Sequence, residues 1–151
     1  MASILETDSV TKKFGGFTAV DNVTLKVDPG EIRFIIGPNG AGKSTFFKLV
    51  IGYHSPNSGT ILYKGQNVEK LKLHERINLG MGVKFQAPSV FSELTVLENL
   101  SLANNREESL NINDLLNDFA LENDKNNLAG DLSHGKKQWL DIALSTISKP
   151  D

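Results

Sequence analysis

The stretch Gly37-Pro38-Asn39-Gly40-Ala41-Gly42-Lys43-Ser44 has the spacing G-x-x-x-x-G-K-[ST], which is typical of loops that bind nucleotide phosphates. Its glycines allow the backbone to curl so that several N–H groups point at one anion. A helix that begins near Gly42 would add the positive end of its dipole. We expect Lys43 to reach the β- and γ-phosphates and the Ser44 hydroxyl to bind magnesium, with Thr45 supporting the loop. The stretch therefore predicts a site for ATP with Mg²⁺.

The segments on either side of this loop supply the context that the pattern requires. The apolar run 32–36, bounded by glycines, predicts a strand buried on both faces, as in a parallel sheet. After the loop, Phe46, Leu49 and Val50 have helical spacing, and Gly52 is expected to end that helix. An accidental glycine-rich turn would not be flanked by a buried strand and an amphipathic helix, so we favour the phosphate-binding interpretation.

The rest of the chain is predicted to contain strands first and helices afterwards. Alternation of apolar and polar residues, or a short apolar run before a turn, predicts strands over 23–27, 60–63 and 81–85. Thr95 and Glu98 form a capping-box pattern in front of one helix, and Ser133 is a suitable N-cap for another. Apolar residues at helical spacing predict a further helix over 112–119.

Composition limits the possible partners. The 151 residues include 16 basic and 18 acidic side chains, which gives no electrostatic footprint for nucleic acid. There is no cysteine, so neither a disulfide framework nor a thiolate metal site is expected. No apolar run approaches the roughly 20 residues of a membrane helix, and Glu6 and Asp8 interrupt any signal-like stretch. We therefore expect no direct membrane insertion and no nucleic-acid partner.

Several motifs, taken together, resemble those of ATP-binding cassette (ABC) proteins, and they occur in the order that this family has. The glycine-rich loop resembles the Walker A motif, and Lys84-Phe85-Gln86 resembles the strand that leads into the Q-loop. The segment Leu132-Ser133-His134-Gly135-Lys136-Lys137-Gln138 resembles the signature motif LSGGQ, with His134 and Lys136 as departures. Phe14-Gly15-Gly16 stands where the family has an aromatic residue that stacks on adenine. The resemblance covers essentially all of the chain.

The resemblance implies a role for each of these residues. Phe14 would stack on the base, and Gln86 would ligate Mg²⁺ and sense the γ-phosphate. Ser133, with the amides of His134 and Gly135, would face the γ-phosphate bound by a second ATPase subunit in a head-to-tail dimer. Plainer interpretations exist for each: a core aromatic, a surface glutamine, a simple helix cap and a solvent-exposed first-turn histidine. We assign no catalytic role to His134.

The fold implied by the resemblance is the α/β P-loop NTPase fold of ABC type, here incomplete. It would contain an antiparallel β subdomain, part of the parallel core sheet and an α-helical subdomain. Residues 1–151 would form a partial nucleotide-binding domain, with the β subdomain and phosphate-loop core at about 1–86 and the helical subdomain at about 87–151. Residues 87–97 would contact transmembrane permease subunits, which would place the protein in the cytoplasm, peripheral on the inner face of the membrane.

Within the family, the sequence around Gln86 and Ser133 resembles ATPase subunits of urea-type importers, and those of branched-chain amino-acid importers less well. The implied function is to couple ATP binding and hydrolysis to uptake of a small polar solute such as urea or an amino acid. The alternative is a truncated nucleotide-binding remnant without turnover. A cassette protein of DNA repair or translation ranks lower. Repair members of the family carry long insertions between the Walker A and signature motifs, whereas only 89 residues separate Lys43 from Ser133 here. A GTPase is disfavoured because no N-K-x-D sequence is present.

The family's Walker B aspartate, its catalytic glutamate and its switch histidine have no counterparts here. No apolar run ending in Asp-Glu occurs, and the chain stops at Lys149-Pro150-Asp151. We therefore expect nucleotide binding with negligible hydrolysis by this chain alone. Without the family's later strands, we also expect the apolar faces of 32–36 and 81–85 to be exposed and the chain to be marginally stable or prone to aggregate.

Overall fold

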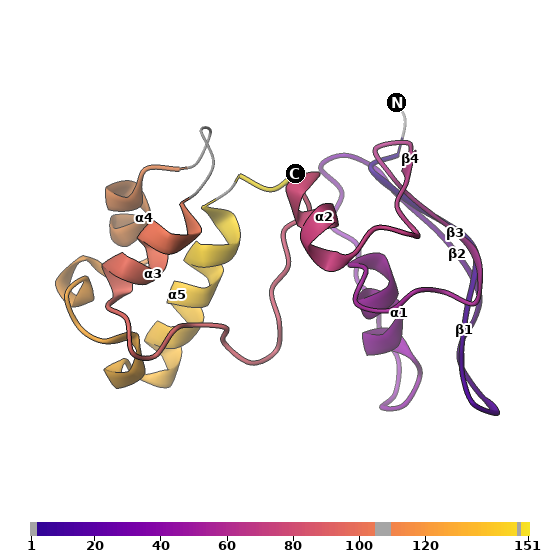
Figure 1. The fold of residues 1–151 in the computed structure, drawn as a ribbon, viewed down its shortest axis with the longest axis horizontal. Coiled ribbons are helices and arrows are strands. Elements are labelled where there is room, and N and C mark those ends of the chain that lie inside the picture. Colours follow the sequence, from indigo (N-terminus) through magenta and orange to yellow (C-terminus); the bar gives the residue numbers. More distant parts are fainter. Residues whose placement is uncertain (1–2, 105–109, 148) are drawn as a thin grey trace. The chain divides into compact units, whose positions relative to one another are not determined.

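Two compact units make up the fold, Met1–Asn78 and Leu79–Asp151 (Figure 1). The computed structural model describes residues 3–104, 110–147 and 149–151. The first unit contains β1 (Leu5–Phe14), β2 (Phe17–Val27), α1 (Lys43–Val50), β3 (Ser58–Tyr63), β4 (Gln66–Asn67) and α2 (Leu73–Asn78). The second contains α3 (Val96–Ala103), α4 (Ile112–Asp118), the 3₁₀ turns η1 (Glu122–Asp124) and η2 (Ala129–Asp131), and α5 (His134–Thr146).

An antiparallel sheet with the order β2-β1-β3-β4 forms the first unit's scaffold. The strands β1 and β2 form a hairpin whose tight turn contains Gly15 at φ 56°, a left-handed conformation that glycine adopts without strain. The third strand pairs on the other side of β1, with Leu5 opposite Tyr63. The strands predicted at 23–27 and 60–63 are therefore confirmed, the first as the end of a longer strand.

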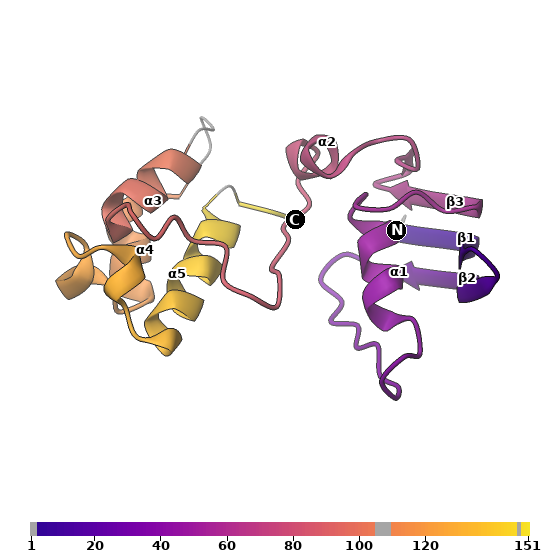
Figure 2. The ribbon, with the colours of Figure 1, turned by 60° about the horizontal axis from the view of Figure 1, so that its bottom comes forward.

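The helix α1 lies against one face of this sheet (Figure 2). Its predicted apolar face is confirmed, because Phe46, Leu49 and Val50 are all buried. The side chains of Val10 and Ile61 are buried within the same unit. The glycine-rich loop precedes α1 directly, so the packing of this helix on the sheet determines where the loop lies.

Residues 32–36, predicted as a strand of a parallel sheet, and residues 81–85, predicted as a further strand, do not form strands. Neither range belongs to a strand in the described chain, and Ile32, Phe34 and Ile36 are 81%, 81% and 90% exposed. The prediction was wrong because an apolar run shows a tendency to be buried but does not supply a partner. A strand forms only when a neighbour pairs with its N–H and C=O groups. The exposure of these three residues agrees with our other expectation for 32–36, that its apolar side chains would be exposed, whereas Met81 and Val83 in 81–85 are half-buried.

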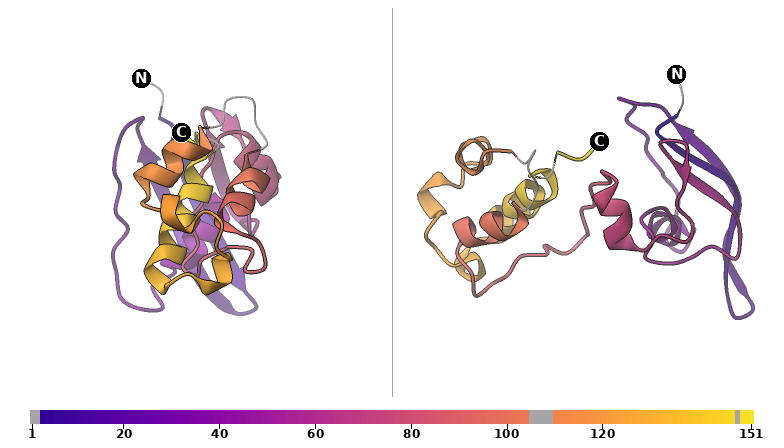
Figure 3. Two further views of the ribbon diagram at one scale, coloured as in Figure 1. Left: turned by 90° about the vertical axis from the view of Figure 1, so that its left-hand side faces the viewer. Right: turned by 45° about the horizontal axis from the view of Figure 1, so that its top comes forward.

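The helices α3, α4 and α5 and the 3₁₀ turns η1 and η2 surround the core of the second unit (Figure 3). The helices α3 and α5 lie side by side in this core. The predicted helix over 112–119 is confirmed as α4, which buries Leu115 and Leu116. The buried cluster comprises Val96, Leu100, Leu115, Leu116, Leu121, Ala129, Leu132, Leu140, Ala143 and Ile147. Within the described ranges, no helix is long and apolar enough to cross a bilayer.

Both predicted helix caps are present in this unit. The Thr95 hydroxyl accepts the N–H of Glu98 at 3.1 Å, and the Glu98 carboxylate accepts the N–H of Thr95 at 2.7 Å. At α5, the Ser133 side chain accepts the N–H of Lys136 at 3.4 Å. The hydrogen bonds from the backbone and side chain of Thr95 lower the pKa of Glu98. These contacts satisfy N–H groups that the first turn of a helix leaves without partners.

Replacing Thr95 by alanine is expected to lower the free energy of unfolding of the second unit by about 1 kcal/mol, because the N–H of Glu98 loses its acceptor. Glu98 has a lower pKa when folded than when unfolded. Its stabilising contribution is therefore present above its ordinary pKa and is lost as the pH falls through the lowered value. Urea unfolding between pH 7 and pH 3 should show a weaker acid dependence in the variant. Ser101→Ala serves as the control, because it removes an exposed hydroxyl of α3 that donates to the Leu97 carbonyl and does not cap the helix.

Candidate functional site

Left-handed glycines give the loop 37–44 its curled path. Gly40 and Gly42 both have φ 84°, a conformation that side-chain-bearing residues rarely adopt. Gly42 also lies so close to β2 that a Cβ atom there would stand 2.1 Å from the Ala19 carbonyl oxygen. The Ala41 N–H donates to the Pro38 carbonyl at 3.3 Å. The loop is therefore folded around its own backbone and anchored to the sheet at Gly42.

Lys43 occupies the inside of this loop. Its Nζ donates to the carbonyl oxygens of Gly37 and Pro38, both at 2.7 Å. The first backbone hydrogen bond of α1 runs from the Phe46 N–H to the Gly42 carbonyl. The N–H groups of the first turn, from Lys43 to Thr45, therefore have no intrahelical acceptor. An ammonium group and several N–H donors thus converge at one end of α1, as an anion site requires.

The side chains around Lys43 fit a nucleotide with Mg²⁺. Gly37, Pro38, Asn39, Gly40 and Ala41 are exposed, so ligand phosphates can reach the loop backbone. Ser44 is also exposed, and its hydroxyl oxygen is the kind of hard ligand that Mg²⁺ takes. Thr45 is half-buried. The donors present are therefore suited to phosphate and to a hard cation.

Phe14 lies at the end of β1 with 45% of its surface exposed. Its ring meets the His54 ring edge-on at a centroid distance of 5.5 Å, and Lys12 Nζ lies 5.3 Å from its centroid. Burial, followed by the charges of Lys12 and Lys48, lowers the pKa of His54, so the neutral imidazole is favoured beside the ring. Phe14 is thus an exposed aromatic surface with support behind it, as a base-stacking residue needs.

Gln86 lies in the second unit, in an exposed segment fastened to α5 on both sides of it. Before Gln86, Lys84 Nζ donates to Gln138 Oε1 at 2.6 Å and lies 3.0 Å from Asp141 Oδ2. After it, the Ser89 N–H donates to Asp141 Oδ1 at 2.9 Å. Asp141 is only 4% exposed, so these contacts offset part of the cost of burying a carboxylate. The segment that carries Gln86 is therefore tied to the helix that follows Ser133.

Ser133, His134 and Gly135 form the exposed N-terminus of α5. Ser133 is the N-cap, so the plain interpretation as a helix cap is correct whatever else the residue does. Lys136, one of the two departures from the family motif, forms an ion pair with Asp124 at 2.5 Å. This pair fastens the first turn of α5 to η1.

The structure brings together the expected residues of the loop, from Gly37 to Thr45, in the first unit, and it places Gln86 and Ser133 in the second. Sequence reasoning missed Asp141, which holds the Gln86 segment. The sequence feature that could have revealed it is an acidic residue about one turn after Gln138, beside the apolar positions of α5. It also missed the buried Arg76 of α2, whose hydrogen-bond acceptors include residues far away in the sequence.

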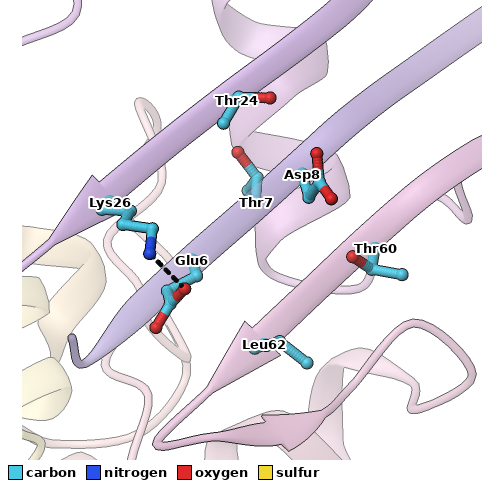
Figure 4. A pocket seen from close by; sticks show the side chains of 7 residues that line it. All are labelled: Glu6, Thr7, Asp8, Thr24, Lys26, Thr60 and Leu62. Atoms are coloured by element: carbon cyan, nitrogen blue, oxygen red, sulfur yellow. Dashed lines mark ion pairs between the residues drawn. The ribbon is translucent and has the colours of Figure 1, made fainter. Parts of the chain in front are cut away.

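A shallow pocket of about 220 Å³ lies elsewhere, on the strands of the sheet (Figure 4). An ion pair between Glu6 and Lys26, 3.1 Å long, crosses two of these strands. The remaining lining residues are Thr7, Asp8, Thr24, Thr60 and Leu62. None of them belongs to the glycine-rich loop, so this pocket is separate from the nucleotide site.

Comparisons with known proteins show the family that this chain resembles. A family model described as ABC transporter matches residues 20–151. The chain is 33% identical to the spermidine/putrescine import ATP-binding protein PotA of Nitrosospira multiformis, covering 98% of the chain and 42% of that protein. It is also 33% identical to the branched-chain amino acid transport ATP-binding protein BraF of Pseudomonas aeruginosa, covering 97% of the chain and 66% of BraF.

Solved structures show the same likeness. The ATP-binding cassette MJ1267 of an ABC transporter superposes with a TM-score of 0.85 at 27% identity, covering 99% of this chain and 67% of that one. CbiO1 of Clostridium perfringens, part of the transporter complex cbiONQ, gives a TM-score of 0.83 at 25% identity, covering 99% and 63%. The chain therefore spans 42% and 66% of the lengths of the two curated relatives above.

Proposed function

Because this chain belongs to the ABC transporter family, we propose that it binds MgATP as part of the ATP-binding subunit of an importer. The observation that carries this proposal is the position of Lys43, whose ammonium group is held inside a curled loop at the N-terminus of α1. The expected α/β fold of ABC type is confirmed by the likeness to known cassettes.

In this proposal, the loop contributes positioned charge. Lys43 would exchange its two carbonyl acceptors for phosphate oxygens, and the N–H groups of Gly40 to Thr45 would surround the phosphates. Ser44 and Gln86 would hold Mg²⁺, which neutralises phosphate charge when bound. Phe14 would stack on the base through its exposed surface. Each of these contacts binds or orients the nucleotide, and none of them transfers a proton.

We further propose that Ser133, His134 and Gly135 act on nucleotide held by a second ATPase subunit in a head-to-tail dimer. Their exposure at the N-terminus of α5 leaves them accessible to a partner. Residues 87–97 would contact transmembrane permease subunits, which would hold the protein at the cytoplasmic face of the membrane. The family relationship supports this arrangement, since CbiO1 is part of a transporter complex.

The transported solute is proposed only as a class. The relatives named above handle polyamines or branched-chain amino acids according to their names, and the sequence around Gln86 and Ser133 resembles urea-type importers. We propose import of a small polar solute such as urea or an amino acid. The alternative function is nucleotide binding without turnover.

Isothermal titration of the chain with ATP, with and without Mg²⁺, tests the central proposal. We expect saturable 1:1 binding that is tighter with Mg²⁺ and is displaced by ADP. Phosphate release is measured on the same samples. Because this chain alone is expected to hydrolyse ATP negligibly, binding without release agrees with both functions, whereas appreciable release would contradict the alternative. If ATP does not bind at millimolar concentration, the proposal is wrong.

A further inference from the structure

Arg76 is a charged residue inside the first unit, and the phosphate-loop chemistry described above does not use it. Its side chain is 1% exposed. Its Nη1 donates to the carbonyl oxygens of Leu49 and Val50, at 2.8 and 2.6 Å. Its Nε donates to the Leu71 carbonyl at 3.0 Å, and its Nη2 makes a longer contact of 3.3 Å with the Glu69 carbonyl. The guanidinium group is therefore surrounded by backbone oxygens.

The position of these oxygens explains why a buried charge is tolerated. Leu49 and Val50 are the last two residues of α1, where carbonyl groups lack donors within the helix. The Leu49 carbonyl also accepts the N–H of Gly52 at 3.1 Å. They also carry the negative end of the helix dipole, which favours a cation. Burial lowers the pKa of Arg76, while the nearby Glu69 carboxylate opposes that effect. An arginine remains protonated under these conditions, because its ordinary pKa is so high.

A glycine makes room for this guanidinium group. Gly52 follows α1 with φ 77°, and a Cβ atom there would stand 2.7 Å from Arg76 Nε. It would also stand 2.8 Å from the Leu71 carbonyl oxygen. The end of α1, the Arg76 side chain and the segment before α2 thus fit together only with glycine at position 52. Residues that are distant in sequence therefore pack closely around the Arg76 side chain.

We infer that Arg76 is a positioning residue for the phosphate loop. The loop precedes the amino end of α1, and Arg76 holds the carboxyl end of the same helix. The amino end of this helix is fixed where Gly42 meets the Ala19 carbonyl, and the carboxyl end is fixed by the guanidinium group. The helix is only eight residues long, so a tilt at its carboxyl end is transmitted to Lys43 and Ser44 within about 12 Å. This role rests on the proposed nucleotide site and adds a residue to it that does not touch the ligand.

Three variants of Arg76 separate positioning from simple stability. Arg76→Met removes the charge and the hydrogen bonds but keeps a long side chain, whereas Arg76→Lys keeps the charge without the planar fork of donors. We expect the MgATP dissociation constant to rise roughly three- to tenfold for Arg76→Met and less for Arg76→Lys. In Arg76→Ala, low-millimolar guanidinium should restore part of the lost affinity.

The control is Val10→Ala, which removes buried apolar contacts from the same unit at a position in β1 that provides none of the hydrogen bonds to Arg76. It should lower stability while the dissociation constant of the folded protein stays within twofold of wild type. NMR signals of the Gly40 and Gly42 amides provide a readout that needs no nucleotide. These signals should shift in Arg76→Met and remain in place in Val10→Ala.

The outcomes are distinguishable. If the wild-type chain fails to bind ATP, the proposed function is wrong, and the glycine amide signals still decide the role of Arg76. If Arg76→Met loses stability as Val10→Ala does, with unchanged loop signals and unchanged affinity, Arg76 is merely structural and the inference is overturned. Should Arg76→Met not fold, Arg76→Lys is measured in the same way, and loop signals identical to wild type would overturn the inference.

Discussion

Lys43→Ala is expected to weaken MgATP binding by roughly 10- to 100-fold, because hydrogen bonds between an ammonium group and phosphate are charge-assisted. The ammonium group already lies inside the loop, 2.7 Å from the carbonyl oxygens of Gly37 and Pro38. Phosphate oxygens can replace these acceptors with little reorganisation of the lysine. The variant also leaves the two carbonyl groups of the exposed loop to water, so we expect only a small change in stability.

Titration calorimetry of Lys43→Ala and Lys48→Ala against MgATP measures this effect. Lys48 lies in the last turn of α1, where its ammonium group stands 5.5 Å from the Tyr53 ring centroid. Both variants lose one positive charge from the same helix, so Lys48→Ala controls for the long-range field. The role of Lys43 as a direct ligand would be contradicted by an equal loss of affinity in the two variants.

Gly42→Ala is expected to destabilise the first unit by roughly 3–5 kcal/mol, from backbone strain and a steric clash together. The left-handed backbone at φ 84° accounts for about 1–3 kcal/mol of this when a side chain is present. The rest arises because the new methyl group would lie 2.1 Å from the Ala19 carbonyl oxygen and 3.2 Å from its carbon. A backbone carbonyl in a strand cannot rotate away, so α1 must separate from β2. Nucleotide binding should be lost with it.

Gly40→Ala is the matched control for this prediction. Gly40 has the same φ of 84°, but a Cβ atom there would meet nothing within 4 Å. The difference in the free energy of unfolding between the two variants therefore gives the cost of the contact with Ala19 without the cost of the left-handed backbone. Urea unfolding followed by circular dichroism gives both values. Equal midpoints for Gly40→Ala and Gly42→Ala would show that the loop does not pack on β2 in solution.

Structural features could be predicted best from the sequence where they depend on local interactions. The loop spacing, the capping pair Thr95 and Glu98, and the N-cap Ser133 each involve residues within a few positions of one another, and the structure has all of them. The likeness of the chain to ABC cassettes was also evident from short motifs. Local patterns are reliable here because turns and caps are formed by neighbouring residues.

Features that depend on distant partners were missed. The run that includes Ile32 and Phe34 is apolar enough for a buried strand, yet it is exposed, since no described strand pairs with it. Arg76 looks like a surface residue of a short helix, but its main acceptors, Leu49 and Val50, precede it by more than 25 positions. Asp141 likewise holds Ser89 from another segment. The periodicity of apolar residues and the spacing of a motif contain no information about partners that are distant in sequence.

The pairing of β1 with β3 has a consequence for folding kinetics. The β1–β2 hairpin closes through neighbouring residues and can form within microseconds. Pairing Leu5 with Tyr63 instead closes a long stretch of chain. This pairing is expected to form slowly, because folding rates fall as the sequence separation of contacting residues rises. The glycine-rich loop and α1 lie within that stretch. The nucleotide site is therefore expected to acquire its shape in the slowest step of the unit's folding, and substitutions at the β1–β3 seam should delay ligand binding during refolding.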